Sequence, residues 1–528
     1  MRKNNMVNRM TGMAMALVLP VCAGIPGTVL ADEEKKELNV LIWDFGYSTA
    51  LPYDDNYWFD YIQKNFGDPN HIQVNFVSMN RNDETTMLNV WMASGEAPDI
   101  IYTYDINLVQ NYLKQGGLAD LTDAVENYGS HLIDYIGEEN QSVGNIDGRQ
   151  MFLVGNRAVD IGIVGSVIRG DWLDELGLEV PTTTEEFYEV MTAFKEKDPG
   201  NVGENLIPWA MSMQEISFGY FNTLYSFVDP DMTEKEMATI YPFNYPGYED
   251  GVRFVNKCFS EGLISPEFAL DTDSTKMWSD VVNGYVGFLT ANVCSGFSTG
   301  SYYDQMKENV PGAYYVACDP FTNSKGEHTK LGNNPWDKYI MVPASSDAVD
   351  EAIKYMDWIA SDEEIMLNLM YGAEGEDKGW YRNEEGLIIA NDDYMGEDRD
   401  VTGVTNQSLV FFSNGFDYGD EELNTKAQTI SYNDPQAAIQ YEQALTDRRS
   451  DPWFFPVWPQ AIESEAEYSG AMAEKYKEIF TRLYMCTPDQ FDAMYEEQVG
   501  EFMDLYGTEV CEERTAVWEQ YYGDAQER

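Results

Sequence analysis

The pattern of apolar and polar positions after residue 37 predicts a parallel sheet with helices on its faces. Apolar runs at 38–43, 72–78 and 99–102 have the length of strands, and the first is apolar at nearly every position. Such continuity is typical of a parallel strand that is covered on both sides. Between these runs, 56–66 and 85–93 repeat apolar residues at helical spacing. The order strand, helix, strand, helix, strand indicates an α/β fold.

The same pattern continues in the second part of the chain. A further strand is predicted at 159–168, followed by a helix that Asp171 caps and Gly177 closes. Helices are also predicted at 181–197 (with threonine at its cap), 247–261, 347–361, 363–371 and 462–522, the last with one break at 486–488. Residues 372–460 are rich in Gly, Asn, Asp and aromatic residues and are predicted to form long loops.

The first 31 residues have the layout of a secretory signal peptide. Arg2, Lys3 and Arg9 give a positive start, and no charged residue follows until Asp32. We expect cleavage after Ala31, where the sequence Val-Leu-Ala suits a signal peptidase. Lipidation of Cys22 is the second choice and a retained membrane anchor the third, because prolines and glycines interrupt the apolar stretch.

The net charge of the chain restricts the kinds of molecule that it can bind. With 91 acidic and 33 basic residues the formal net charge is −58, and the leader holds no acidic residue. Such a field repels nucleic acid and anionic membrane surfaces. A hydrophobic fraction of 44% is ordinary for a globular protein, so we interpret the acidic residues mainly as a solvated surface. The length of 528 residues predicts two to four domains or lobes.

Few residues of this sequence are suited to bind a metal ion or a cofactor. After cleavage five widely spaced cysteines would remain without a CxxC pair, which we interpret as buried free thiols, with one or two isolated disulfides as the alternative. His328 lies in a polar loop and is expected at the surface. The acidic pairs Asp392-Asp393 and Glu397-Asp398 lack the spacing of a calcium loop. We therefore predict no cofactor and no metal site.

Several segments, in order along the chain, resemble one known family. They are Ala93-Ser94-Gly95-Glu96-Ala97-Pro98-Asp99-Ile100, Gly117-Leu118-Ala119-Asp120-Leu121-Thr122-Asp123, Arg169-Gly170-Asp171-Trp172-Leu173-Asp174-Glu175-Leu176-Gly177-Leu178, Pro181-Thr182-Thr183, Ala193-Phe194, Glu261-Gly262-Leu263-Ile264, Asn283-Gly284-Tyr285-Val286-Gly287 and Tyr371-Gly372-Ala373-Glu374-Gly375-Glu376. Together they resemble extracellular solute-binding proteins of family 1, the substrate-capturing subunits of ABC importers, many of them specific for oligosaccharides. The residues before Cys22 depart from the lipoprotein signal that such subunits often carry.

The resemblance implies a two-lobed α/β fold of the periplasmic-binding-protein type, with hinge strands and a helical C-terminus. The first lobe would comprise residues 37–155 and about 335–420, and the second 156–334 and about 421–528. A ligand would sit between the lobes, and their closure around it would be the signal that the importer detects.

Loops at strand ends supply the first candidate ligand contacts, because this sheet type binds ligands beyond the carboxyl ends of its strands. The candidates there are Trp43, Asp44, Tyr47, Tyr104 and Asp105. Flat aromatic rings can stack on the apolar faces of sugar rings, and polar side chains can pair with sugar hydroxyls. Trp172 and Trp58, which lie at helical spacing, are instead expected in the core.

Four further candidates lie in the second part of the chain. Trp336 and Trp380 lie in aromatic loops with polar neighbours. Trp453 belongs to a proline-rich aromatic cluster for which we favour bracing of the lobes over ligand contact. Arg169 would leave a hinge strand toward the ligand, and a salt bridge to a nearby acid is an equally strong interpretation.

The predicted function is therefore ligand capture for import. The ligand would be a small molecule or oligosaccharide, the protein partners would be the permease subunits, and the subunit would be a monomer outside the cell membrane. The alternatives are a secreted glycan-active enzyme, which needs two carboxylates placed across the scissile bond, and a surface glycan-binding or sensory protein. Neither an HExxH motif nor a phosphate-binding loop is present, which favours binding over catalysis.

Overall fold

The computed structural model describes residues 35–44, 57–157, 164–213, 221–292, 302–318, 321–328, 330–331, 334, 336–391, 406–413, 415–429, 452–453, 458, 460 and 462–523. Lys36 to Arg528 form one compact unit. The predicted leader with Cys22, and the acidic pairs of residues 392–398, lie outside the described residues. Among the described residues, no helix combines the length and the apolar composition that a membrane crossing needs.

The strands of the described chain are β1 (Lys36–Asp44), β2 (Ile72–Asn80), β3 (Ile101–Thr103), β4 (Asn145–Ile146), β5 (Arg149–Gln150), β6 (Leu153–Asn156), β7 (Val164–Arg169), β8 (Ile207–Ala210), β9 (Val286–Asn292), β10 (Tyr315–Ala317), β11 (Lys330–Leu331), β12 (Trp336–Met341), β13 (Trp380–Arg382), β14 (Ile388–Ala390) and β15 (Pro452–Trp453).

The α-helices are α1 (Tyr57–Ile62), α2 (Glu84–Ser94), α3 (Ile106–Lys114), α4 (Thr122–Tyr128), α5 (Ser130–Ile136), α6 (Glu138–Gln141), α7 (Gly170–Leu176), α8 (Thr184–Lys197), α9 (Phe221–Tyr225), α10 (Glu234–Thr239), α11 (Tyr248–Ser260), α12 (Thr275–Val282), α14 (Tyr302–Asn309), α15 (Val349–Ala360), α16 (Glu363–Tyr371), α17 (Asn406–Leu409), α18 (Glu421–Thr429), α20 (Glu463–Met485), α21 (Phe491–Phe502) and α22 (Thr508–Tyr521).

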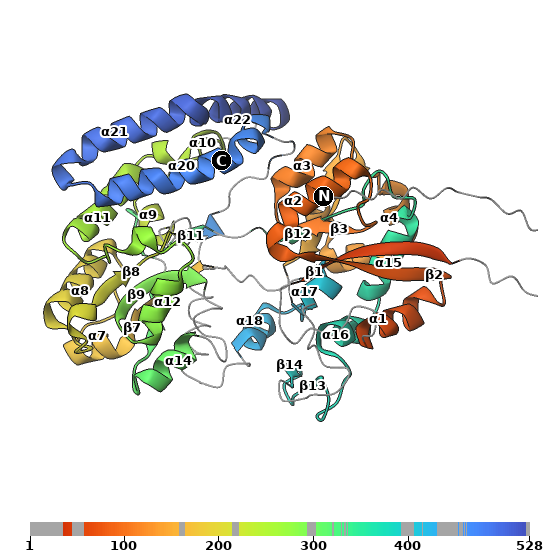
Figure 1. Ribbon diagram of the computed structural model, residues 1–528, viewed down its shortest axis with the longest axis horizontal. Coiled ribbons are helices and arrows are strands. Elements are labelled where there is room, and N and C mark those ends of the chain that lie inside the picture. The colour runs from red at the N-terminus through yellow and green to blue at the C-terminus, as the bar shows by residue number, and fades with distance from the viewer. Residues whose placement is uncertain are drawn as a thin grey trace, which may run out of the picture. The chain divides into compact units, whose positions relative to one another are not determined.

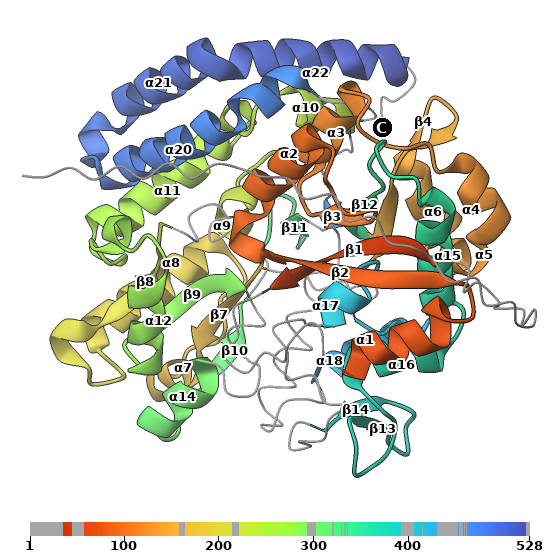
Figure 2. The ribbon, with the colours of Figure 1, turned by 45° about the vertical axis from the view of Figure 1, so that its right-hand side comes forward.

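The first sheet has the predicted parallel start. β1 pairs with β2 in parallel register from Lys36–Ile72 to Asp44–Asn80. On its other side, β1 meets the chain just before β3 through a parallel bridge between Val40 and Ile100. β3 then pairs with β12, and β12 with β6, both antiparallel. β1 lies beside β2, with α15 and α16 nearby (Figure 2).

A buried carboxylate joins the first and third strands. Asp99 accepts hydrogen bonds from the backbone and side-chain nitrogens of Asn39 at 2.8 and 3.0 Å. Its other oxygen accepts the Ser346 hydroxyl at 2.6 Å. Asp99 is the acidic residue of the Pro98-Asp99 turn noted in the sequence, so one function of that turn is to fix where β3 begins.

The second sheet has the order β10, β7, β9, β8. β7 is antiparallel to both of its neighbours, whereas β8 and β9 run parallel. Helix α8 begins as predicted, because the Thr183 hydroxyl accepts the Glu186 amide at 3.1 Å. Gly177 closes α7 with φ of 65°, a conformation that glycine adopts without strain. Asp171 does not cap α7, however, since the cap position is Arg169 and Asp171 lies inside the first turn.

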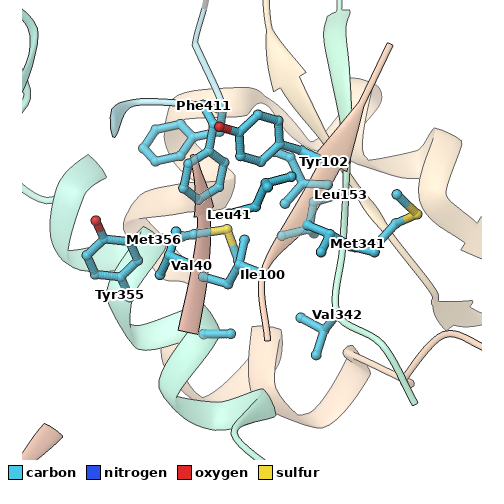
Figure 3. Close-up of a cluster of buried hydrophobic side chains, with 14 of the residues drawn as sticks. Val40, Leu41, Ile100, Tyr102, Leu153, Met341, Val342, Tyr355, Met356 and Phe411 are labelled. Atoms are coloured by element: carbon cyan, nitrogen blue, oxygen red, sulfur yellow. The ribbon is translucent and has the colours of Figure 1, made fainter. Parts of the chain in front are cut away.

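The first sheet belongs to one large hydrophobic cluster, whereas the second sheet packs on a large cluster and on a smaller one. The first cluster comprises buried residues of 38–154, 339–370 and 409–412. Within it the Tyr102 and Phe411 rings stack at 5.0 Å, and Met356 lies near Val40 (Figure 3). The second cluster combines residues of 168–321 with the C-terminal residues 462–517. The chain therefore passes between the clusters after β6, before β12 and again after Phe412.

The C-terminal helices are long and nearly continuous, as predicted. α20, α21 and α22 lie beside α10 and α11 (Figure 1). The predicted break is anchored by Asn256 of α11, whose amide donates to the carbonyls of Leu483 and Cys486 at 2.9 and 2.8 Å. Asn256 is almost fully buried, and its amide donates to carbonyls that the end of α20 would otherwise leave unpaired.

Candidate functional site

Five strand ends meet at one edge of the first sheet. Asp44 of β1 pairs with Asn80 of β2, so both strands finish there. β3 is parallel to β1, and Trp336, at the amino end of the antiparallel β12, pairs with Asn156 at the carboxyl end of β6. The edge therefore collects residues from the ends of β1, β2, β3 and β6 and the start of β12. We call it the carboxyl edge.

Two aromatic rings and a guanidinium form the centre of this edge. The Trp43 and Tyr104 rings stack with their centroids 5.4 Å apart. The Arg81 guanidinium carbon lies 4.4 Å from the Trp43 centroid and 5.3 Å from that of Tyr104. Trp43 is fully buried, whereas Tyr104 is 39% exposed. Tyr104 and Arg81 can therefore face a ligand while Trp43 supports them from below.

A buried acid orients Arg81. Its guanidinium pairs with Glu84 at 2.5 Å, and the other Glu84 oxygen accepts the hydroxyl of Thr103. Burial raises the pKa of the Glu84 carboxyl, with the Thr103 hydrogen bond and Arg81 acting in the opposite direction. Asp105 caps α3 by accepting the Asn107 amide at 2.9 Å, and its own amide donates to Thr103 at 3.0 Å. Asp105 thus positions the loop that carries Tyr104.

Trp336 lies at the same edge and is partly buried. Its indole nitrogen donates to the Tyr339 hydroxyl at 3.3 Å. The Arg157 guanidinium donates to the carbonyls of Asn334 and Trp336 at 2.9 and 3.2 Å. Asn156 donates to Asp417 at 3.0 Å. These bonds fix the chain where β6 ends and β12 begins.

Lys338 is a buried cation below the edge. Its ammonium donates to the Phe411 carbonyl at 3.1 Å and lies 5.7 Å from the Tyr104 ring centroid. The side chain is fully buried. Two cations, Arg81 and Lys338, therefore lie near Tyr104, and the Glu84 carboxylate pairs with the first of them.

The structure does not direct Arg169 toward the carboxyl ends of its sheet. β7 starts at the edge where β8 and β9 end, because Val164 pairs with Asn292, so Arg169 lies at the opposite edge. Its guanidinium makes two bonds of 2.7 Å to Asp171 and one of 2.9 Å to the Gly284 carbonyl. The side chain is 1% exposed and lies over Trp172. The salt bridge anticipated as the alternative is the observed arrangement.

Trp380 is a core residue. It is 2% exposed, packs with Leu367 and Ile388, and donates its indole N–H to the Gly372 carbonyl at 2.9 Å. The sequence predicts a loop residue that could contact a ligand, but the segment forms the hairpin β13–β14 and turns the indole inward. The expected core positions of Trp58 and Trp172 are confirmed, since each is 1% exposed.

The remaining candidates are described only in part. Asp44 ends β1 at the carboxyl edge and is partly buried. Trp453 pairs through its backbone with Leu331 in the short parallel sheet β11–β15. Tyr47 lies outside the described residues. His328 is exposed, as expected, and the four cysteines in the described ranges are free thiols: Cys258, Cys318, Cys486 and Cys511.

Sequence analysis missed three cations of this edge. Arg81 directly follows β2, so the strand-end rule that selected Tyr104 would also have selected it. Arg157 follows β6 in the same way, but that strand was not predicted. Lys338 lies inside β12, where only the tertiary structure shows that it is buried.

The chemistry of the carboxyl edge suits the binding of a polar ring compound. Tyr104 and Trp336 supply flat apolar surfaces, and Arg81 supplies donors for hydroxyl groups. Glu84 and Asp105 are already engaged with Thr103 and with the start of α3. Within the described ranges, no group of three or more His, Cys, Asp or Glu side chains is arranged to hold a metal ion.

One known protein family and several known proteins match a large part of this chain. The family model of the bacterial extracellular solute-binding protein matches residues 52–366, more than half of the chain. Lipoprotein LipO of Bacillus subtilis is 31% identical over 333 residues, which cover 57% of this chain and 60% of LipO. The polygalacturonan/rhamnogalacturonan-binding protein YtcQ of the same organism is 27% identical over 314 residues, 56% of this chain and 60% of that protein. The matches thus span about three fifths of these relatives.

A solved structure extends the likeness to nearly the whole chain. The ABC-transporter substrate-binding protein FusA of Streptococcus pneumoniae, in complex with kestose, has a TM-score of 0.65 at 14% identity. The similarity covers 92% of this chain and 99% of that structure. At this identity it establishes the fold, which is the expected α/β fold of two lobes. The chain belongs to the family of bacterial extracellular solute-binding proteins.

Proposed function

We propose that this protein is the extracellular substrate-binding subunit of an ABC importer and captures a neutral oligosaccharide by closure of two lobes. The observation that carries the proposal is the carboxyl edge, where the exposed Tyr104 ring lies beside Arg81 and above the buried Trp43. This combination of a ring face and fixed donors matches the faces and hydroxyls of a sugar.

The relatives support a carbohydrate ligand. YtcQ is named for binding polygalacturonan and rhamnogalacturonan, and FusA was solved with kestose. For this chain we favour a neutral glycan, because its net charge of −58 opposes an acidic one at long range. A binding role without turnover fits these relatives, which are named as binding proteins.

The division into lobes follows the hydrophobic clusters. We propose that residues 37–155 and about 335–420 form one lobe, and that 156–334 and about 421–528 form the other. The separation of the first cluster from the two clusters that pack on the second sheet supports this division. The hinge would then lie in the connections after β6, before β12 and after Phe412.

The proposed ligand contacts are Tyr104, Arg81 and Trp336 at the carboxyl edge, together with Asp44, Tyr47 and Trp453 from the adjoining loops. Trp43 and Asp105 would act as supports. Arg169 and Trp380 are left out because packing and hydrogen bonds already engage their polar groups.

We further propose export by the leader, cleavage after Ala31 and function as a monomer that docks on permease subunits at the outer face of the membrane. Lipidation of Cys22 is the alternative mode of retention. The family assignment and the similarity to LipO support an extracellular location.

Thermal unfolding of residues 32–528 tests the proposed ligand class. The panel contains kestose, raffinose and maltotriose as neutral sugars and trigalacturonate as an acidic one. A ligand that binds only the folded state stabilises it by about 2.7 kcal/mol at a hundredfold excess over its Kd. We expect a raised Tm with a neutral member and intact sugar afterwards. No shift with any sugar, or breakdown of the sugar, would contradict the proposal.

A further inference from the structure

Glu84 is a buried carboxylate at the carboxyl edge. It is the first residue of α2, and its side chain is 6% exposed. One of its oxygens lies 2.5 Å from the Arg81 guanidinium, and the other accepts the Thr103 hydroxyl. In the described part of the chain no hydrogen-bond donor meets the first oxygen, so the charge of Arg81 compensates it. The ionised carboxylate and Arg81 therefore depend on each other.

The ion pair holds Arg81 over the rings of this edge. The Arg81 side chain is 32% exposed and starts from the short turn between β2 and α2. Its guanidinium carbon lies 4.4 Å from the Trp43 centroid and 5.3 Å from that of Tyr104. A long, partly exposed arginine adopts many rotamers unless a partner fixes it. Loss of the Glu84 charge would therefore let Arg81 turn away from the rings into water.

The other oxygen of Glu84 acts on Tyr104 through the backbone. Thr103 is fully buried, and its hydroxyl donates to Glu84 while it accepts the Asp105 amide at 3.0 Å. Tyr104 lies between these two residues in the chain. A hydrogen bond to a charged acceptor is stronger than one to a neutral acceptor. Protonation of Glu84 would therefore weaken the contact that fixes the Tyr104 backbone.

The charged and titratable groups around Glu84 are Arg81, Asp105, Tyr102 and Tyr112. Burial raises the pKa of Glu84 above 4.5, Asp105 acts in the same direction, and the Thr103 bond and Arg81 oppose them. Burial also raises the pKa of Tyr102, and that of Tyr112 to about 12, so both phenols stay neutral at physiological pH. Glu84 is therefore protonated at a higher pH than an exposed glutamate.

We propose that Glu84 makes ligand binding at the carboxyl edge depend on pH, with the ligand held while Glu84 is ionised and released when it is protonated. Protonation removes the partner of Arg81 and weakens the hydrogen bond that fixes Tyr104. A ligand that prefers the ionised form binds more tightly as the pH rises through the pKa of Glu84. This inference rests on the proposed function, because it assigns a control to the same site.

Chemical labelling of Arg81 tests the mechanism without a ligand. Residues 32–528, as wild type and as Glu84→Gln, are treated with phenylglyoxal, and the modified peptides are quantified by mass spectrometry. Glutamine has the shape of the protonated acid and carries no charge. We expect Arg81 to react at least about threefold faster in Glu84→Gln, because the ion pair no longer holds it. Arg482, which is 50% exposed, is the internal reference. Equal Arg81 rates would overturn the proposal.

Asp280→Asn is the matched control. Asp280 is also a buried carboxylate on a helix, and it pairs at 2.5 Å with a more exposed cation, Lys276. It belongs to α12, outside the carboxyl edge. Asp280→Asn should therefore leave the labelling rate of Arg81 as it is in the wild type. A faster rate in this variant as well would show that Arg81 responds to any lost carboxylate, which would contradict a specific role of Glu84.

Calorimetric titration with kestose, or with the panel sugar that raises Tm most, tests the pH dependence. We expect the wild type to bind at least about threefold more weakly at about pH 5 than at about pH 7.5, a range in which exposed glutamates stay mostly ionised. Asp280→Asn should show the same drop. Glu84→Gln should bind weakly at both pH values. The wild-type comparison needs no variant, so it stands even if Glu84→Gln folds poorly.

The outcomes separate this inference from the proposed function. A wild-type Kd that is equal at both pH values, or an equal drop in Glu84→Gln, would overturn the pH dependence and leave sugar capture intact. If no sugar of the panel binds at either pH, the proposed function fails and this inference fails with it.

Discussion

Arg81 and Arg169 carry the same guanidinium group, but their surroundings suit Arg169 to a structural role and Arg81 to ligand contact. Arg169 is 1% exposed and directs its donors to Asp171 and Gly284. The Arg81 side chain is 32% exposed and lies over Trp43 and Tyr104. Arg81 is therefore accessible to a ligand while it keeps its pair with Glu84, whereas Arg169 would have to give up a buried ion pair, which would be costly.

At the residue scale, Tyr104→Ala should weaken binding of a stabilising glycan by about three- to tenfold. This corresponds to about 0.7–1.4 kcal/mol, the contribution of one aromatic contact. Titration calorimetry measures the change. Tyr128 is the matched control, because it is an exposed tyrosine (37% against 39%) that lies over Lys354 and away from the carboxyl edge. Equal losses in Tyr104→Ala and Tyr128→Ala would contradict the site.

At the element scale, helix α5 is joined to α15 through Asp357. One Asp357 oxygen accepts the amides of His131 and Leu132 at 2.7 and 3.0 Å, at the start of α5. The other oxygen contacts the His131 ring at 2.9 Å. Asp357 thus caps a helix that is distant in sequence, and local sequence patterns cannot reveal such a cap.

The His131 pair should make stability depend on pH. The Asp357 hydrogen bond raises the pKa of His131 above 6.5. The stabilisation is therefore fully present below pH 6.5 and is lost as the pH rises through the folded-state pKa. His131→Gln should lower the unfolding free energy at acidic pH by less than about 1 kcal/mol, because the ring is exposed, and should have little effect at alkaline pH. Denaturant unfolding at several pH values measures this difference, and a larger cost at alkaline pH would contradict the assignment.

Asp357→Ala should cost more than His131→Gln. It removes the backbone cap as well as the ion pair, which predicts a loss of about 1–2 kcal/mol. This loss should persist at alkaline pH, where the histidine is neutral, and unfolding measured there separates the two contributions. Equal stabilities of Asp357→Ala and the wild type at alkaline pH would show that the cap contributes nothing.

Phe243 holds the C-terminal helices against the second cluster. Its ring is 2% exposed and lies 4.8 Å from Tyr476 and 5.4 Å from Phe502 between centroids. Phe243→Ala should cost about 3–5 kcal/mol in denaturant unfolding, since it removes a large buried ring between two segments. Leu270→Ala is the control, because Leu270 is 82% exposed. A cost below about 1 kcal/mol for Phe243→Ala would mean that the helices are not held there.

At the scale of the whole molecule, the net charge of −58 dominates. Like charges on a compact chain repel one another, and salt screens them. Raising the ionic strength from about 0.01 to about 0.15 M shortens the Debye length from about 30 to about 8 Å. We therefore expect Tm to rise with NaCl over this range, and equally with KCl. A flat or falling Tm, or a rise with only one of the two salts, would contradict a general screening effect.

The sequence by itself determined several elements and their ends, but it predicted neither β6 nor the β13–β14 hairpin, which lies in the segment expected to form long loops. The apolar run of β1, the threonine cap of α8 and the proline break after α20 are local properties, so residue types and spacing suffice to predict them. It also identified the strand ends after β1 and β3 as candidate ligand positions, because the parallel order of a sheet follows from alternating strands and helices.

The tertiary structure decided which of the candidate side chains are accessible to a ligand. The antiparallel direction of β7 placed Arg169 at the far edge, and the β13–β14 hairpin turned Trp380 into the core. The contacts of Lys338 and Asn156 depend on segments that lie far apart along the chain. Pairing direction and long-range contacts are global properties of the fold, and no local pattern of residues contains them.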